Sequence, residues 1–143
     1  MPKRLRPELF NVIYAQVPRL CVEAVIVSED GVALSKRDIE PEKGKWNIPG
    51  GTVLFGESLK DAVIRVAKEE VGLDVSVGYI LGTIEYPRIY QDKAHTVGLA
   101  ILCYVISGEL SGGDEGREVG WFTELPDNII QEQGLFLRVV HVA

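Results

Sequence analysis

Apolar residues recur along the chain with two different spacings, and these spacings separate one clear helix from a series of strands. Between residues 58 and 71 the spacing is three or four, which predicts a helix with one buried face. Ser58 and Asp61 at its start have the form of a capping box, and Gly72 suits a C-terminal cap. Both ends of this helix are therefore marked in the sequence.

Stretches rich in β-branched and other apolar residues predict the strands of a sheet. Asp30 and Gly31 form a turn signal between the first two stretches, so a β-hairpin is expected there. Pro49, Gly50 and Gly51 predict a break after a short extended piece. The predicted strands cover residues 20–27, 32–35, 46–48, 75–86, 96–106 and 119–122, and further helices are expected over residues 7–17 and from about Pro126. The pattern as a whole predicts an α/β (α+β) fold, with a mixed β-sheet in an α/β/α sandwich.

Length and charge limit the kind of protein that this chain can be. With 143 residues, 46% of them hydrophobic, the chain predicts a single domain over residues 1–143. A formal net charge of -6 disfavours broad binding to nucleic-acid backbones. The longest nearly continuous apolar run, residues 97–106, is too short for a membrane-spanning helix, and no secretory signal follows the basic first residues. We therefore expect neither nucleic acid nor a membrane as a partner.

The two cysteines, Cys21 and Cys103, each lie inside an apolar run and lack Cys-x-x-Cys spacing. Cysteines in this setting are usually buried free thiols, although a pair is arithmetically allowed. Free thiols are typical of reducing compartments, so we expect a cytoplasmic protein.

Two adjacent carboxylates at the end of the predicted helix point to metal chemistry. Glu70 stands seven residues after Val63 and four after Val66, so it continues the stripe that these valines supply to the core. Adjacent Glu69 and Glu70 repel each other when ionised, and burial raises the cost. A hard divalent cation would compensate, and Mg²⁺ or Mn²⁺ is commonly held by carboxylates together with substrate phosphates. The alternative is a solvated helix end on which both carboxylates pair with neighbouring basic side chains.

Glu69 and Glu70 belong to a pattern of fixed spacings that begins at Gly51 and continues through Glu57 and Arg65 to Gly72. This pattern resembles the Nudix box, G-x5-E-x7-R-E-U-x-E-E-x-G-U, in which U is a bulky aliphatic residue. The residues that precede it, 44–51, also look like the family's usual approach to the box. The resemblance implies a Nudix-like α/β/α sandwich and a hydrolase that cleaves nucleoside diphosphates linked to another group, X, usually with Mg²⁺. Six of the seven fixed letters are matched, by Gly51, Glu57, Arg65, Glu69, Glu70 and Gly72.

The same resemblance implies roles for individual residues. Glu69 and Glu70 would be metal ligands, and Glu57 would reach a metal through water. Glu57 and Arg65 would also support the loop-helix-loop of the box, although they could form an ordinary surface ion pair. Gly50 and Gly51, which we also count as substrate-binding candidates, would let the backbone turn and approach the metal site, although they could form a plain turn.

The chain departs from the box at Val66, where the family has a glutamate that commonly binds metal or helps to activate water. A valine can neither hold a cation nor take a proton, so a base is expected from elsewhere, or fewer metals, or another reaction. The Gly-rich, acidic loop over residues 112–118 resembles the family loop that often supplies a catalytic carboxylate, which makes Glu115 and Glu118 candidate catalytic residues. His95 is an alternative base.

Few residues in the sequence indicate how a substrate would be recognised. Trp46 could stack on a nucleobase or pack in the core, while Arg37 and Arg88 could bind phosphates or lie on a solvated face. No motif shows whether the substrate is ADP-ribose, a dinucleotide, a nucleotide sugar or a nucleoside triphosphate. Dimers are frequent among Nudix proteins, so the resemblance also allows for a homodimer.

These features lead to one main hypothesis and two alternatives. The main hypothesis is a Mg²⁺-dependent pyrophosphohydrolase in which Glu69 and Glu70 hold the cation against the substrate diphosphate. GDP-mannose mannosyl hydrolases, a Nudix branch that lacks part of the box, imply a second reaction, in which water attacks the sugar carbon. The third hypothesis is a catalytically degenerate domain that binds a nucleotide without cleaving it.

Overall fold

The computed structural model describes residues 3–40, 42–86, 94–113 and 117–140, and a mixed β-sheet lies at its centre. β1 (Arg19–Ser28) is the central strand, because it pairs with three others. It runs parallel to β6 (Thr96–Ser107) and antiparallel to β2 (Gly31–Lys36) and β4 (Gly50–Thr52). The remaining strands are β3 (Trp46–Asn47) and β7 (Val119–Phe122), which pair with β2, and β5 (Asp74–Glu85), which pairs with β6.

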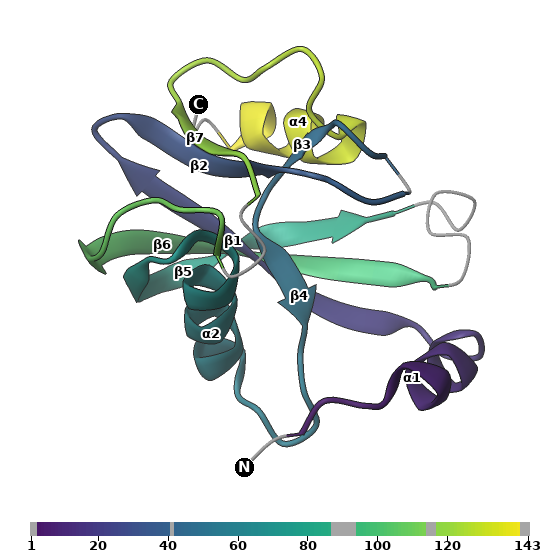
Figure 1. The fold of residues 1–143 in the computed structure, drawn as a ribbon. Helices are drawn as coiled ribbons and strands as arrows, with labels where there is room; N and C mark the ends of the chain where they lie inside the picture. Colours follow the sequence, from purple (N-terminus) through teal and green to yellow (C-terminus); the bar gives the residue numbers. More distant parts are fainter. Residues whose placement is uncertain (1–2, 41, 87–93, 114–116, 141–143) are drawn as a thin grey trace.

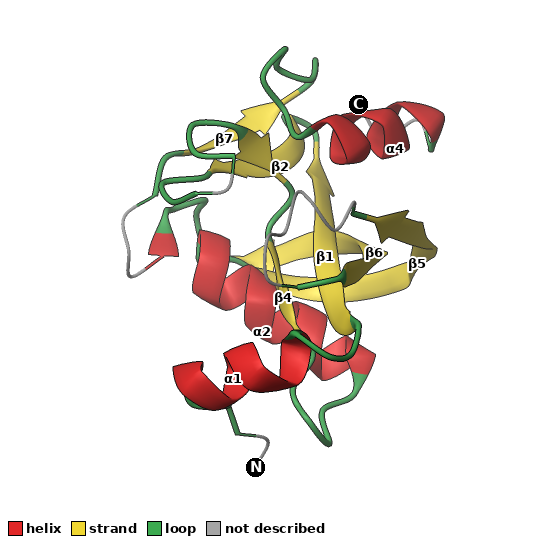
Figure 2. Ribbon diagram, turned by 90° about the vertical axis from the view of Figure 1, so that its right-hand side faces the viewer, coloured by secondary structure: helices red, strands yellow, loops and turns green. Residues whose placement is uncertain are grey.

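Alternate residues of β1 face two different parts of the core. Val22, Ala24 and Ile26 pack in the cluster that α2 (Leu59–Val71) completes. Val25 packs in a second cluster, with Leu137 of α4 (Gln131–Val139). α2 therefore covers one face of the sheet and α4 the other, as Figures 1 and 2 show. This arrangement confirms the predicted sandwich around a mixed sheet.

The best-marked helix of the sequence forms as predicted. The Ser58 side chain accepts a hydrogen bond from the backbone N–H of Asp61 at 3.0 Å, which caps the first turn of α2. Gly72 follows the helix with φ of 71°, in the left-handed region that a glycine adopts without strain. Both predicted cysteine environments are also confirmed, since Cys21 and Cys103 are free and buried. Among the described residues, no helix is both long and apolar enough to cross a membrane.

Three local predictions were wrong at their boundaries. The first helix, α1 (Pro7–Tyr14), ends before residue 17, because the carbonyl of Ile13 accepts hydrogen bonds from two later N–H groups and closes the last turn. α4 begins at Gln131 instead of near Pro126, because the residues before it pair with Trp46 on β3. The predicted break at residues 49–51 ends at Pro49, because Gly50 and Gly51 already belong to strand β4, which pairs antiparallel with β1.

The hairpin between β1 and β2 depends on a glycine. Gly31 has φ of 112°, and a Cβ there would lie 2.0 Å from the carbonyl oxygen of Phe122 on β7. We expect Gly31→Ala to lower the free energy of unfolding by at least about 3 kcal/mol, because it adds a backbone collision to the conformational strain. Gly56→Ala is the matched control, since Gly56 also has positive φ but open space around it. It should cost only about 1 to 2 kcal/mol. Equal losses for the two variants in urea denaturation would contradict this explanation.

Candidate active site

The last turn of α2 presents two carboxylates where a helix least favours them. Glu69 and Glu70 are the final residues of α2 before Val71, close to the negative end of the helix dipole. The side chain of Glu69 is 39% exposed and that of Glu70 is 24% exposed. Glu70 thus lies at the margin of the buried stripe and not inside it, which corrects the expectation of a core position. Both carboxylates need positive charge around them.

Arginine side chains supply that charge from three parts of the chain. Arg65, one turn earlier on α2, donates to Glu69 at 3.0 Å. Arg4 of the N-terminal segment also donates to Glu69. Arg117, which precedes β7, donates to Glu70 at 2.7 Å. The two carboxylates are therefore neutralised by guanidinium groups on opposite sides.

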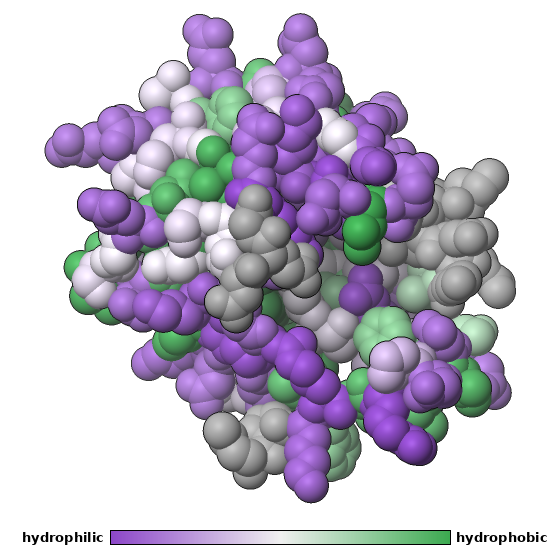
Figure 3. Space-filling view, viewed as in Figure 1, coloured by the Kyte–Doolittle hydropathy of each residue, from purple (hydrophilic) through white to green (hydrophobic). Residues whose placement is uncertain are grey.

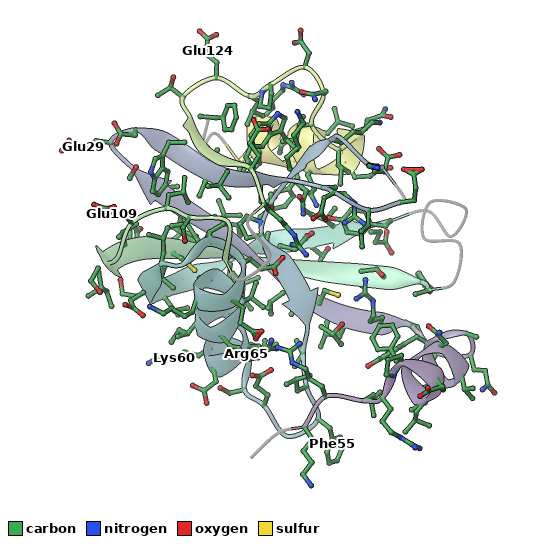
Figure 4. All side chains as sticks on the ribbon, viewed as in Figure 1. Glu29, Phe55, Lys60, Arg65, Glu109 and Glu124 are labelled. Carbon is green, nitrogen blue, oxygen red and sulfur yellow. The ribbon has the colours of Figure 1, made fainter. Side chains whose placement is uncertain are left out.

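Arg65 also ties the loop after β4 to α2. Its Nε donates to Glu57 Oε2 at 2.8 Å, and its terminal nitrogen donates to Glu57 Oε1 at 3.0 Å and to the Thr52 carbonyl at 2.9 Å. Glu57 Oε1 further accepts from the N–H of Leu54 at 3.1 Å. Hydrogen bonding from Arg65 holds the pKa of Glu57 below its usual value. Both oxygens of Glu57 are thus engaged inside the protein, and Figure 4 shows Arg65 turned toward β4.

The two glycines of β4 let this strand approach its neighbours closely. A Cβ on Gly50 would lie 3.1 Å from the carbonyl oxygen of Val22, and one on Gly51 would lie 3.1 Å from Cγ2 of Val66. Val66 is 2% exposed and belongs to the core cluster beneath β4. The valine that departs from the Nudix box therefore fills the space between α2 and β4 with a methyl group.

A cavity of about 410 Å³ opens beside these residues. Its lining is highly charged, because it includes arginines from four separate segments together with carboxylates. The arginines are Arg4, Arg19, Arg37 and Arg117. The carboxylates are Glu23, Asp38, Glu42 and Glu70. Hydrophilic side chains also cover most of the face drawn in Figure 3, on which β4 and α2 lie in Figure 1.

A second cavity, of about 250 Å³, adjoins the first. Gly50, Gly51 and Glu70 line both cavities, so β4 and the end of α2 form the wall between them. Glu69 and Val66 line the smaller one. The predicted residues Glu69, Glu70, Gly50 and Gly51 are thus brought together.

Other predicted site residues lie elsewhere. Trp46 is 8% exposed and packs edge-on against Phe122, with ring centroids 4.8 Å apart, so the structure places it in the core. Glu118 is 64% exposed and pairs with Lys36 at 3.8 Å, turned toward β2. Glu115 and Arg88 lie outside the described residues.

Sequence reasoning missed a buried carboxyl in the cavity, that of Glu23 on β1. Its side chain accepts hydrogen bonds from Tyr86 and from Gln133, the latter at 3.1 Å. Burial raises the pKa of Glu23 to about 7, although these hydrogen bonds and the charge of Arg19 oppose the rise. The available signal was a single acidic residue inside the apolar run of residues 20–27.

The chain matches the NUDIX domain family model over residues 17–131. The low-salt glycan biosynthesis protein Agl8 of Haloferax volcanii is 46% identical over 117 residues, which are 81% of this chain and 73% of that protein. An ADP-ribose pyrophosphatase of Methanocaldococcus jannaschii is 35% identical over 105 residues, 73% of this chain but only 62% of that protein, less than two thirds of its length. The crystal structure of a MutT NUDIX hydrolase from Burkholderia pseudomallei superposes with a TM-score of 0.77 at 29% identity, covering 86% of this chain and 98% of that one.

The contact between Arg65 and Glu57 requires the fork of a guanidinium. We expect Arg65→Lys to lower the free energy of unfolding at pH 7 by about 1 to 3 kcal/mol, because the charge stays and the bidentate geometry is lost. The pKa of Glu57 is lowered in the folded state, so its contribution is present above its unfolded pKa and is lost as the pH falls through the folded value. The difference between the variant and the wild type should therefore shrink in acid.

Urea denaturation at pH 7 and pH 3 measures this difference. Lys60→Arg is the control, because Lys60 is exposed on the same helix and points away from the site in Figure 4. A loss for Arg65→Lys that stays constant with pH would contradict the role given to Glu57.

The raised pKa of Glu23 predicts a pH dependence of the opposite sign. Between its ordinary value of 4.5 and about 7, the folded protein keeps a proton that the unfolded chain releases, so this carboxyl makes stability fall as the pH rises. Glu23→Gln removes this titration. The free energy of unfolding of the variant minus that of the wild type should therefore increase by about 3 kcal/mol as the pH rises from 4.5 to 8. Urea denaturation at several pH values across this range measures the free energy of unfolding of both proteins. Plots of this free energy against pH that run parallel for the two proteins would refute the prediction.

Proposed function

Because the chain belongs to the NUDIX family of hydrolases, we propose that it hydrolyses the pyrophosphate linkage of a nucleoside diphosphate joined to another group. One observation carries this proposal: a cavity with arginines from four segments opens onto Glu70 and the glycines of β4. Guanidinium groups bind phosphate oxygens bidentately, and a diphosphate carries enough negative charge to engage several of them. The names of two relatives, a glycan biosynthesis protein and an ADP-ribose pyrophosphatase, support a nucleotide sugar or an ADP-ribose-like substrate.

A divalent cation, Mg²⁺ or Mn²⁺, fits the donor set at the end of α2. Glu69 and Glu70 offer oxygen ligands only, which hard cations prefer, and both line cavities. Among the described residues, no three His, Cys, Asp or Glu side chains are grouped to hold a metal by themselves. Phosphate oxygens of the substrate would therefore complete the coordination, as is usual for Mg²⁺. When bound, such a cation neutralises phosphate charge and polarises the phosphoryl group.

The arginines then divide into two tasks. Arg37 and Arg117 line the larger cavity and are our candidates for contacts to the phosphates. Arg65 acts through Glu57, because its hydrogen bonds hold the loop after β4 against α2. Glu57 is accordingly proposed as a supporting residue, with any contact to the cation through water.

The general base is proposed to come from the loop that precedes β7. The residues before it are anchored at the end of α2, since Ser111 donates to the Val71 carbonyl at 3.0 Å and a Cβ on Gly113 would lie 2.2 Å from the Glu69 carbonyl. Arg117 after it contacts Glu70. Glu115 lies between these anchors in the sequence and is our first candidate for the base. Glu118 is the second candidate, and its pairing with Lys36 counts against it.

Attack at the sugar carbon is a second candidate reaction. Val66 supports it, because the box position at which the family carries a glutamate is filled here by a buried methyl group against Gly51. The glycan biosynthesis name of the 46% identical relative is also compatible with a nucleotide-sugar substrate. Hydrolysis in ¹⁸O-water separates the two reactions. Label on a phosphate product would establish attack at phosphorus, and label on the released sugar would establish attack at carbon.

Two further proposals concern the setting of the reaction. The free, buried thiols of Cys21 and Cys103 favour a reducing compartment, so we propose the cytoplasm. A homodimer stays a prediction from the family, which light scattering on the purified protein can check.

Glu70→Gln tests the proposed function directly. We expect kcat for ADP-ribose and GDP-mannose to fall by roughly a hundredfold or more, because a neutral amide binds a hard cation poorly. Mn²⁺ binding, followed by electron paramagnetic resonance, should weaken in parallel. Glu124→Gln is the matched control, because Glu124 is exposed in the loop after β7, and its side chain points outward at the edge of the molecule in Figure 4. Full activity of Glu70→Gln would overturn the metal assignment.

A further inference from the structure

Glu23 lies where a carboxyl is costly, in the middle of the central strand. Its neighbours Val22 and Ala24 are fully buried, and Glu23 itself is 5% exposed. Across the β1–β4 ladder Glu23 pairs with Gly50, so it stands next to the strand that carries the candidate active site. It also lines the larger cavity together with Glu70. One cavity thus joins the buried carboxyl to the proposed catalytic end.

One oxygen of this carboxyl is fully engaged. The backbone N–H of Ile48 donates to Gln133 Oε1 at 2.6 Å, which fixes the orientation of the Gln133 amide. Gln133 Nε2 then donates to Tyr86 Oη at 2.8 Å and to Glu23 Oε1 at 3.1 Å. The Tyr86 hydroxyl donates to the same oxygen. Oε1 therefore receives two hydrogen bonds from a network whose donors are ordered.

The other oxygen, Oε2, is buried and has no hydrogen-bond partner among the described residues. A buried carboxylate oxygen without a donor is costly, and native structures rarely keep one unless something binds there. The space around it is kept by a glycine, because a Cβ on Gly98 of β6 would lie 2.3 Å from Oε2. Glu23 thus lines the cavity as a residue, and its Oε2 atom, which lies against Gly98, stays unpaired among the described residues.

We propose that Glu23 Oε2 accepts a hydrogen bond from a neutral N–H or O–H donor on the substrate, in the part that is not phosphate. This inference rests on the proposed function for the identity of the substrate. Oε2 offers an acceptor and no donor, so the phosphate oxygens would bind elsewhere in the cavity, beside arginine side chains such as Arg117. Two sources can supply the donor: the nucleobase, or a hydroxyl of the group joined to the diphosphate. Glu23 would thus select substrates by the donor that they carry.

The environment of Glu23 gives this contact a pH dependence. Burial raises the pKa of Glu23 to about 7, so the carboxylate is the acceptor above that pH and is protonated below it. The titratable groups that face it are Arg19 and Cys21 on β1 and Tyr86 after β5. Among the described residues, the contacts from α4 and β6 come from neutral groups, Gln133 and Gly98. Substrate binding should therefore weaken as the pH falls through about 7.

Glu23→Gln is the first test, with steady-state kinetics on GDP-mannose and ADP-ribose. The network keeps the amide oxygen at the Oε1 position, so an N–H₂ group replaces the acceptor Oε2. We expect KM at pH 8 to rise about tenfold to a hundredfold with little change in kcat, and the rise to narrow at pH 6. Glu29→Gln, the same substitution in the exposed turn after β1, should leave KM unchanged. An unchanged KM for Glu23→Gln at pH 8 would overturn the proposal.

Tyr86→Phe is the second test and does not depend on the fold tolerating an amide at position 23. The hydrogen bond from Tyr86 lowers the pKa of Glu23, so its loss should move the pH midpoint of KM upward. A purely structural role for Glu23 would leave the midpoint where it is, and that result would count against a direct contact.

Calorimetry identifies the source of the donor. AMP, GMP and UMP probe the nucleoside half of the substrate, and ribose 5-phosphate and mannose 1-phosphate probe the other half. Weaker binding of the nucleotides to Glu23→Gln assigns the contact to the nucleobase, and weaker binding of the sugar phosphates assigns it to the sugar. Equal affinities for wild type and variant in both sets refute the contact. The wild type could cleave no substrate and still bind the nucleotides or the sugar phosphates more tightly than Glu23→Gln does. That result would refute the proposed hydrolysis but would support the contact with Glu23.

Discussion

The close approach of β4 to β1 and α2 is the constraint on which the site depends. Gly50 and Gly51 permit it, because a Cβ at either position would stand 3.1 Å from a neighbouring atom. With β4 this close, the carbonyl oxygen of Thr52 lies 2.9 Å from a terminal nitrogen of Arg65. Arg65 also donates hydrogen bonds to Glu57 in the loop before α2 and to Glu69 on α2 itself. The loop, the strand and the last turn of α2 thus become one rigid unit. A side chain on either glycine would crowd a neighbouring atom, the Val22 carbonyl oxygen or the Val66 methyl group, and would require a small shift between these elements.

Charge balance explains why so many arginines surround this unit. Two adjacent carboxylates at the C-terminal end of a helix face both mutual repulsion and an unfavourable dipole. Arg65 compensates from within the helix, whereas Arg4 and Arg117 come from distant parts of the chain. A divalent cation bound to the carboxylates would take over part of this compensation. Guanidinium groups released from the carboxylates would then be close enough to a phosphate-bearing substrate to bind it.

The sequence was sufficient to predict an element when the residues that stabilise it lie within it or next to it along the chain. α2 carries its own apolar stripe and caps, so its bounds follow from residues 58–72 alone. β4 and the start of α4 could not be predicted in this way, because Gly50 and Ile130 are ordered by partners on β1 and β3. The box spacing predicted which carboxylates meet at the site, whereas Glu23 gave no such pattern. Its hydrogen-bond partners lie 63 and 110 residues away, at Tyr86 and Gln133, and only the folded chain brings them together.

Two parts of the cavity differ in the groups that they offer to a substrate, and this difference bears on how a substrate would enter it. Glu70 with Arg117 lies at the end of α2, and Glu23 with its ordered hydrogen-bond network lies on the opposite face of the sheet, beneath α4. A molecule with a diphosphate at one end and neutral donors at the other matches this difference in one orientation. The reverse orientation would place phosphate against the Glu23 carboxyl and would leave Arg117 without a phosphate to bind. Selection of the substrate and alignment of its scissile bond would then follow from the same distribution of charge.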